Sequence, residues 1–214
     1  MLYVSARSAL PLLLLSSCRS AALDINDMPM KPEITLECRF SRPSADLVEI
    51  RYTLSNAAPH PIYAFTPLSD YQNSQYAPAP ARVYVQLAPN GLVTLSRRLW
   101  ETPETVSVFM PEVPFLTRVA AGGSLEETVR IPIPLIVNYP YLGAGAPEQD
   151  QRPVHRDAAT AVFTMGYIPE EDGLTVTEAP GSPGLFAIGY GPGITRQKLV
   201  SCKAVPLKAS VIVR

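Results

Sequence analysis

The sequence predicts an all-β protein built as an antiparallel sandwich. Apolar residues recur at every second position through many short segments, which is the period of a strand with one buried face. Glycine, proline and asparagine separate these segments, as turns between strands require. The 23 prolines also oppose long helices, because a proline inside a helix costs about 3 kcal/mol. No segment shows a sustained period of 3.6 residues.

The composition is that of a globular chain without a large surplus of charge. Of the 214 residues, 47% are hydrophobic and 17% are charged, so the chain can bury a core of ordinary size. The formal net charge is -1 at pH 7, which leaves no basic surplus to neutralise a run of phosphates. Nucleic acid is therefore not expected as a partner.

Residues 1–18 are expected to be an export signal. Arg7 provides a positive charge, residues 9–15 form an apolar stretch, and small residues follow it. The stretch is shorter than the about 20 apolar residues that span a bilayer. The run Leu15-Ser16-Ser17-Cys18 resembles the lipobox of bacterial lipoproteins. This resemblance implies that Cys18 carries a lipid, becomes the first mature residue and anchors the protein to a membrane of the cell envelope.

The signal departs from the lipoprotein pattern at Pro11, which interrupts the apolar stretch. The alternative is an ordinary cleaved signal peptide that ends near Ala21-Ala22 and leaves the protein free once it is exported. Arg19 supplies no acidic retention signal, so the choice between inner and outer membrane stays open. Residues 19–32 are polar and interrupted by proline, which predicts a tether ahead of a β-sandwich domain at residues 33–214.

The first two strands are expected at residues 33–40 and 47–55, where apolar and polar residues alternate. Asn90-Gly91 is a pair that tolerates positive φ, which predicts a tight hairpin. Two long loops are expected at residues 66–81 and 134–159, where proline and polar residues accumulate. The remaining strands are expected at residues 62–65, 82–87, 92–99, 106–110, 115–119, 125–133, 161–167, 185–190, 197–205 and 207–213.

Two sequence runs resemble the strand pairs of bacterial immunoglobulin-like domains. They are Leu54-Ser55-Asn56, with apolar residues two apart on both sides, and the Gly-Gly-Ser-Leu-Glu-Glu-Thr-Val run at residues 122–129. The resemblance covers roughly residues 33–135 and implies an immunoglobulin-like β-sandwich, here a single domain enlarged by long loops. It implies no functional residue. The antibody pattern is absent, because Trp100 does not follow the first cysteine at the usual spacing.

The three cysteines are an odd number for an exported protein, but a lipid on Cys18 would leave two to pair. Cys38 lies on the inward face of its strand beside Leu36 and Phe40, and Cys202 lies between Val200 and Ala204. We therefore expect a disulfide between Cys38 and Cys202. The alternative is two buried free thiols, which are common in protein cores.

No catalytic residue, metal site or cofactor is expected. His60 and His155 lie in no metal-binding spacing, and serine-hydrolase motifs are absent from the sequence. The glycines at residues 189–193 lack the spacing of a phosphate loop, so they are expected to form a turn. The acidic run Glu170-Glu171-Asp172 is expected to be a solvated turn rather than a calcium site.

Four tyrosines are candidate recognition residues, because each lies in one of the two long loops. They are Tyr71, Tyr76, Tyr139 and Tyr141. Tyrosine combines a large rigid contact surface with a polar tip, which makes it common in recognition loops. The alternative is that these side chains only pack their loops onto the domain.

These observations favour a binding or structural module of the cell envelope rather than an enzyme. Its partners would be a membrane, through the lipid anchor, and an envelope protein or glycan. An envelope hydrolase on a β scaffold is one alternative. A sandwich that acts on a client by strand pairing, as a proteinase inhibitor or chaperone would, is another.

Overall fold

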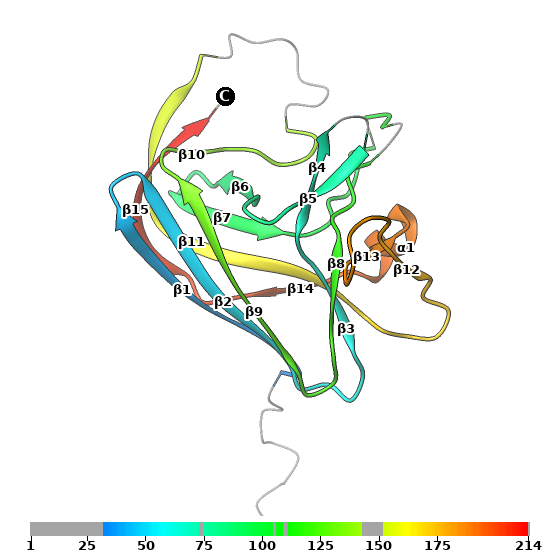
Figure 1. Cartoon of the computed structure of the whole chain (residues 1–214). Helices are drawn as coiled ribbons and strands as arrows, with labels where there is room; N and C mark the ends of the chain where they lie inside the picture. Colours follow the sequence, from blue (N-terminus) through cyan, green and yellow to red (C-terminus); the bar gives the residue numbers. More distant parts are fainter. Residues whose placement is uncertain (1–31, 73–74, 105, 109–110, 143–151, 214) are drawn as a thin grey trace, which may run out of the picture. The chain divides into compact units, whose positions relative to one another are not determined.

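The computed structural model describes residues 32–72, 75–104, 106–108, 111–142 and 152–213 (Figure 1). Pro32–Arg214 form one compact unit. The described elements are β1 (Ile34–Ser44), β2 (Leu47–Asn56), β3 (Ile62–Phe65), β4 (Leu68–Gln72), β5 (Gln75–Ala79), β6 (Tyr84–Leu87), β7 (Leu92–Arg97), β8 (Leu116–Val119), β9 (Ser124–Pro132), β10 (Leu135–Ile136), β11 (Val154–Pro169), β12 (Val176–Glu178), β13 (Phe186–Ile188), α1 (Tyr190–Arg196), β14 (Lys198–Ser201) and β15 (Val205–Val213).

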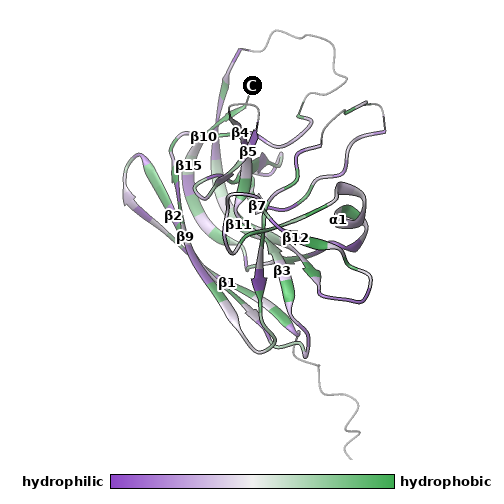
Figure 2. Ribbon diagram, turned by 45° about the vertical axis from the view of Figure 1, so that its right-hand side comes forward, coloured by the Kyte–Doolittle hydropathy of each residue, from purple (hydrophilic) through white to green (hydrophobic). Residues whose placement is uncertain are grey.

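A three-stranded antiparallel sheet in the order β1-β2-β9 forms one layer. Its inward face carries Val48, Ile50 and Leu54, which are fully buried, while charged residues and threonines occupy the outward face. Figure 2 shows this alternation of hydrophobic and hydrophilic residues along the strands. The period-two pattern in the sequence therefore sets the two faces of this sheet.

A ten-stranded sheet forms the second layer, and the 16-residue strand β11 is at its centre. One side of β11 pairs with β15 and then with β14. The other side pairs with β7, in parallel, and then with β3. The sheet thus divides beside β11, into a β7-β6 branch and a β3-β8-β13-β12 branch.

The main core lies between the two layers. Leucine, isoleucine and valine side chains from β2, β9, β7 and β15 make up much of it, and β11 adds Ala158, Ala161, Phe163 and Met165. Tyr52 of β2 packs against Phe163 of β11, with ring centroids 5.0 Å apart. A smaller cluster around Phe65, Leu99 and Leu116 supports the β3-β8 branch. Burial of these apolar side chains is the main stabilising contribution to such a fold.

The predicted all-β class is confirmed, and the two packed sheets form a sandwich-like arrangement. Most strand pairs are antiparallel, but β7 with β11 and β10 with β15 are parallel, so the large sheet is mixed. Parallel pairs join segments far apart in sequence. The alternation of apolar and polar residues within one strand does not tell whether its neighbour runs parallel or antiparallel, so the sequence did not predict these pairs.

Several local predictions are wrong. The expected loop at residues 66–81 contains β4 and β5, which form a separate two-stranded sheet. The expected loop at residues 134–159 contains β10 and the start of β11. Residues 106–108 form no strand, and residues 109–110 of that predicted strand lie outside the described part. The expected turn at residues 189–193 begins α1, where Pro192 is tolerated because it lies in the first turn.

Candidate functional site

Tyr71 and Tyr76 face each other across the β4-β5 pair. They are directly opposite in register, and their ring centroids are 5.2 Å apart in an edge-to-face arrangement. Tyr71 is 55% exposed, which is the largest exposed fraction among the exposed large hydrophobic side chains of the described residues. The hairpin thus presents Tyr71 to solvent beside the partly buried Tyr76, which a packed loop alone does not require.

Trp100 lies in the segment after β7 and is surrounded by aromatic and basic side chains. Tyr139 stacks on its ring at 5.1 Å, and Tyr84 of β6 meets it edge-on at 6.1 Å. The Arg98 guanidinium lies 3.7 Å from the centre of the indole ring, which is a cation–π contact. These contacts fix the indole ring.

Hydrogen bonds through Thr102 connect two further tyrosines. The Tyr190 hydroxyl of α1 accepts a bond from the Thr102 amide at 2.6 Å and donates to the Trp100 carbonyl at 3.1 Å. The Thr102 hydroxyl donates to the Tyr141 hydroxyl at 3.3 Å. Tyr141 has a φ of 66°, in the left-handed region that residues other than glycine adopt less often. Helix α1 and the segment after β10 are thereby held to the segment after β7.

Glu112 is the acidic group of this region. Its carboxylate accepts hydrogen bonds from the Tyr84 hydroxyl and from Arg82, both at 2.8 Å. Burial, followed by the charge of Glu112, raises the pKa of the Tyr84 hydroxyl well above its ordinary value. Burial and the same carboxylate also raise the pKa values of Tyr76 and Tyr141. Tyr76 of β5 and Tyr141 of the segment after β10 therefore lie near one carboxylate.

We call this group the aromatic cluster. It consists of Tyr71, Tyr76, Tyr84, Trp100, Glu112, Tyr139, Tyr141 and Tyr190. The sequence predicted the four tyrosines as candidate recognition residues. In the structure Tyr71 contacts Tyr76, Tyr139 contacts Trp100, and the charge of Glu112 acts on both Tyr76 and Tyr141. The sequence missed the other four members, because they lie in three separate segments. Tyr84 is the one member that the sequence could have indicated. It is a large aromatic residue between the buried Val83 and Val85, so it points to the opposite face of the strand.

Arg97 lies at the point where the large sheet divides, and its side chain is fully buried. It donates to the Glu127 carboxylate at 2.5 Å, to the Thr66 hydroxyl at 2.5 Å and to the Tyr52 hydroxyl at 3.1 Å. It also donates to the carbonyls of Pro80 and Arg82. With so many donors engaged, the guanidinium joins the two layers and is not free to bind a ligand.

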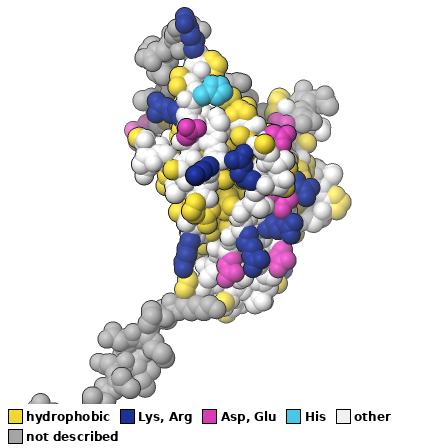
Figure 3. Space-filling view, turned by 90° about the vertical axis from the view of Figure 1, so that its left-hand side faces the viewer, with side chains coloured by type: hydrophobic (Ala, Val, Ile, Leu, Met, Phe, Trp, Pro, Cys, Tyr) yellow, Lys and Arg dark blue, Asp and Glu magenta, His cyan; other side chains and the backbone are white. Residues whose placement is uncertain are grey.

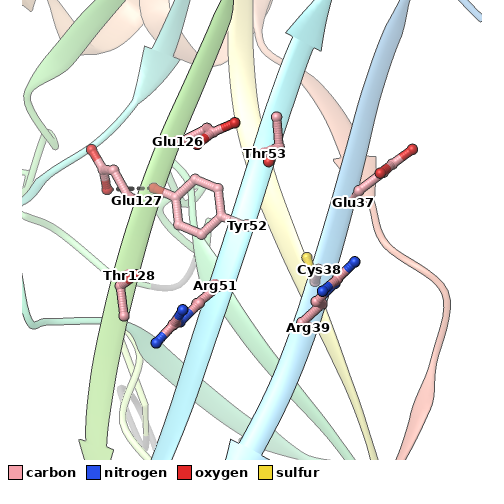
Figure 4. A pocket seen from close by; sticks show the side chains of 9 residues that line it. All are labelled: Glu37, Cys38, Arg39, Arg51, Tyr52, Thr53, Glu126, Glu127 and Thr128. Carbon is pink, nitrogen blue, oxygen red and sulfur yellow. Dashed lines mark hydrogen bonds between the residues drawn. The ribbon is translucent and has the colours of Figure 1, made fainter.

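The outward face of the β1-β2-β9 sheet contains a shallow hollow of about 570 Å³ (Figure 4). Two cross-strand rows line it: Glu37, Thr53 and Glu126 in one, and Arg39, Arg51 and Thr128 in the other. In the row between them, Tyr52 is buried and its hydroxyl donates to Glu127 at 2.5 Å. The face shown in Figure 3 likewise has basic and acidic groups interspersed rather than a patch of one sign. Such a surface is typical of a solvated sheet face.

Cys38 and Cys202 lie next to each other, as the predicted pairing requires, but both are free thiols in this structure. The two thiols interact, since each shifts the pKa of the other. Cys38 comes from β1 of the small sheet, and Cys202 directly follows β14 of the large sheet. The two sulfurs thus meet at the seam between the layers.

The histidines and the acidic run singled out in the sequence do not form a common site. His60 lies before β3 and His155 lies near the start of β11, and both are exposed. Glu170 of the acidic run binds Arg118 and the Tyr63 hydroxyl, each at 2.8 Å. No three metal-binding side chains lie together among the described residues. No helix in the same residues is long and apolar enough to cross a membrane.

Comparisons of the chain with protein-family models, with curated proteins and with solved structures found no match.

Proposed function

We propose that this protein is an exported binding module of the cell envelope and that the aromatic cluster is its recognition surface. The observation that carries the proposal is that tyrosines from the β4-β5 hairpin and from the segment after β10 lie near Glu112, beside Trp100. An aromatic pair with one exposed ring, next to fixed hydroxyl and carboxylate groups, suits a partner with both apolar and hydrogen-bonding surface. An envelope glycan or protein has this chemistry.

The fixed geometry of the cluster supports recognition. Trp100 is held between Arg98 and Tyr139, and Tyr190 is held by three hydrogen bonds. Side chains that are already ordered lose little conformational entropy when a partner binds. Tyr71 and Tyr76 would then be the contacts that a partner covers.

The single tryptophan of the chain lies in the cluster, so its fluorescence can report binding. We expect a saturable change in Trp100 emission when the purified protein is titrated with solubilised cell-wall glycan or with detergent-solubilised envelope proteins. The double variant Tyr71→Ala/Tyr76→Ala should bind at least about tenfold more weakly, as for hot-spot aromatics.

Leu199→Ala is the matched control, because Leu199 is also an exposed apolar residue but lies on β14. Its affinity should equal that of the wild type. An unchanged affinity of the double tyrosine variant, or no emission change with either fraction, would overturn the proposal.

We also propose that the protein is a lipoprotein with an immunoglobulin-like sandwich, anchored through Cys18. Support comes from the lipobox-like run and the apolar stretch before it. Two or more acyl chains, at about 0.8 kcal/mol per buried CH₂, anchor a protein stably. Mass spectrometry of the mature N-terminus should find an acylated Cys18, and Cys18→Ser should release the protein from membranes. A mature chain that starts near Ala22 would instead indicate an ordinary signal peptide.

The disulfide between Cys38 and Cys202 belongs to the same proposal. Export would bring the adjacent thiols into an oxidising compartment, where such pairs form disulfides.

Strand pairing with a client protein is less favoured as the mode of action. The edge strand β1 is mostly polar at its exposed positions and includes Arg39, Arg42 and Pro43, residues of the kind that protect an edge.

A further inference from the structure

The two thiols at the seam between the sheets have different surroundings. Cys202 is 8% exposed, whereas Cys38 on the edge strand β1 is partly exposed. The Cys202 sulfur accepts the Phe163 amide at 3.3 Å, and the Cys202 amide donates to the Phe163 carbonyl at 3.0 Å. Solvent therefore reaches Cys38 more easily, while the backbone holds Cys202 in place.

The interaction between the thiols also separates their acidities. It lowers the pKa of Cys202 to about 7, with a further contribution from the Phe163 amide. The same interaction, together with burial, raises the pKa of Cys38. Cys202 therefore ionises before Cys38, so its sulfur is the one that can accept a proton from Cys38.

We propose that the Cys38 sulfur is the group of this thiol pair that attacks an external disulfide, and that Cys202 is first the base and then the resolving thiol. The partner is a molecule that carries an exchangeable disulfide, either a small compound or a thiol oxidoreductase. This inference rests on the export and disulfide of the proposed function, and it adds the order of the reaction.

The reaction balances in two exchange steps. As Cys38 passes its proton to the adjacent Cys202 thiolate, the Cys38 sulfur attacks the external disulfide, forms a mixed disulfide and releases one external thiolate. Cys202 then loses its proton to that thiolate, attacks the Cys38 sulfur and releases the second external sulfur as a thiolate, which takes a proton from water. Two protein thiols are oxidised and one external disulfide is reduced to two thiols.

The resulting bond would close the seam. β1 is an edge strand of the small sheet: one of its edges pairs with β2, and the other lies beside β14. No hydrogen-bonded strand pairing joins β1 to β14 in the described residues. A covalent bond from Cys38 to Cys202 would join these two strands where hydrogen bonds do not. The seam is thus locked only after oxidation.

The test uses the full-length chain with Cys18→Ser, so that Cys38 and Cys202 are the remaining cysteines. The reduced protein is treated either with oxidised glutathione or with a purified C-x-x-C oxidoreductase in its disulfide form, and is analysed by peptide mass mapping. The parent should end with a Cys38–Cys202 disulfide. Adding Cys202→Ser should trap the mixed disulfide on Cys38, and adding Cys38→Ser should reduce the adduct yield at Cys202 at least about tenfold.

Circular dichroism and Trp100 emission of each variant check that it is folded. An adduct that accumulates on Cys202 faster than on Cys38 would overturn the proposed order while leaving the disulfide intact. Two free thiols in the parent after both treatments would overturn the order and the disulfide together. Neither result bears on glycan or protein binding by the aromatic cluster, which is measured separately.

Discussion

At the scale of single residues, a buried cation connects the two layers. Arg97 has no exposed side-chain surface, and its carboxylate partner Glu127 keeps 29% exposure. Because a charge removed from water needs a partner, the stability of this region depends on that contact. No pattern in the sequence indicates that Arg97 is buried against Glu127. In β7, Arg97 follows the buried Leu95 at an inward position where an apolar residue would be expected.

We predict that Glu127→Ala lowers the free energy of unfolding by about 3 kcal/mol, since it leaves Arg97 buried without its counter-ion. Urea denaturation measures the change. The neighbouring Glu126→Ala is the matched control, because Glu126 lies on the outward face, and it should change stability by less than about 0.5 kcal/mol. Equal effects of the two substitutions would contradict the assigned role of Arg97.

A second residue-scale prediction concerns pH. The bond from Arg118, assisted by the Tyr63 hydroxyl, lowers the pKa of Glu170 below its ordinary value. A lowered carboxyl pKa stabilises the fold above the unfolded-state pKa, and this contribution is lost as the pH falls through the folded-state pKa. The contact is largely exposed, so it contributes less than about 1 kcal/mol. Glu170→Gln should therefore be less stable than wild type at pH 7 and equal to it at pH 2 in denaturation experiments.

At the scale of elements, β11 organises the large sheet. Its pairing with β7 ends at Met165 and its pairing with β3 starts at Tyr167, so Gly166 lies between the two. A Cβ at Gly166 would lie 2.4 Å from the Gln197 Oε1 and 3.0 Å from the Phe65 ring. Gln197 cannot move freely, because its amide group bonds the Leu99 amide at 2.8 Å and the Leu99 carbonyl at 3.0 Å. The dividing point of the sheet therefore needs glycine for space.

Gly166→Ala should destabilise the protein by about 1–3 kcal/mol through overpacking. Gly191 in α1 is the control, because a Cβ there meets nothing within 4 Å, and Gly191→Ala should be neutral or stabilising by up to about 1 kcal/mol. Thermal denaturation of both variants checks the pair. A neutral Gly166→Ala would mean that Gln197 adjusts without losing its bonds to Leu99.

At the scale of the whole molecule, the first strand and the end of the chain meet at the Cys38–Cys202 seam. A disulfide there closes most of the domain into one loop, which stabilises by about 4–5 kcal/mol in the chain-entropy model. For a domain of this size we predict that oxidation raises the melting temperature by roughly 10 °C. Calorimetry with and without reductant measures the shift. Cys38→Ala should abolish the dependence on reductant.

The sequence by itself determined the all-β class, most strand positions, and the inward faces of β1 and β2. Alternation and turn residues are local, so they can be recognised without knowing which strands pair. Only the tertiary structure decided the parallel pairs of β11 with β7 and β15 with β10, the burial of Arg97, and the meeting of Trp100 with Tyr84 and Tyr139. These depend on contacts between segments far apart in the chain, and no local pattern encodes which distant segments meet.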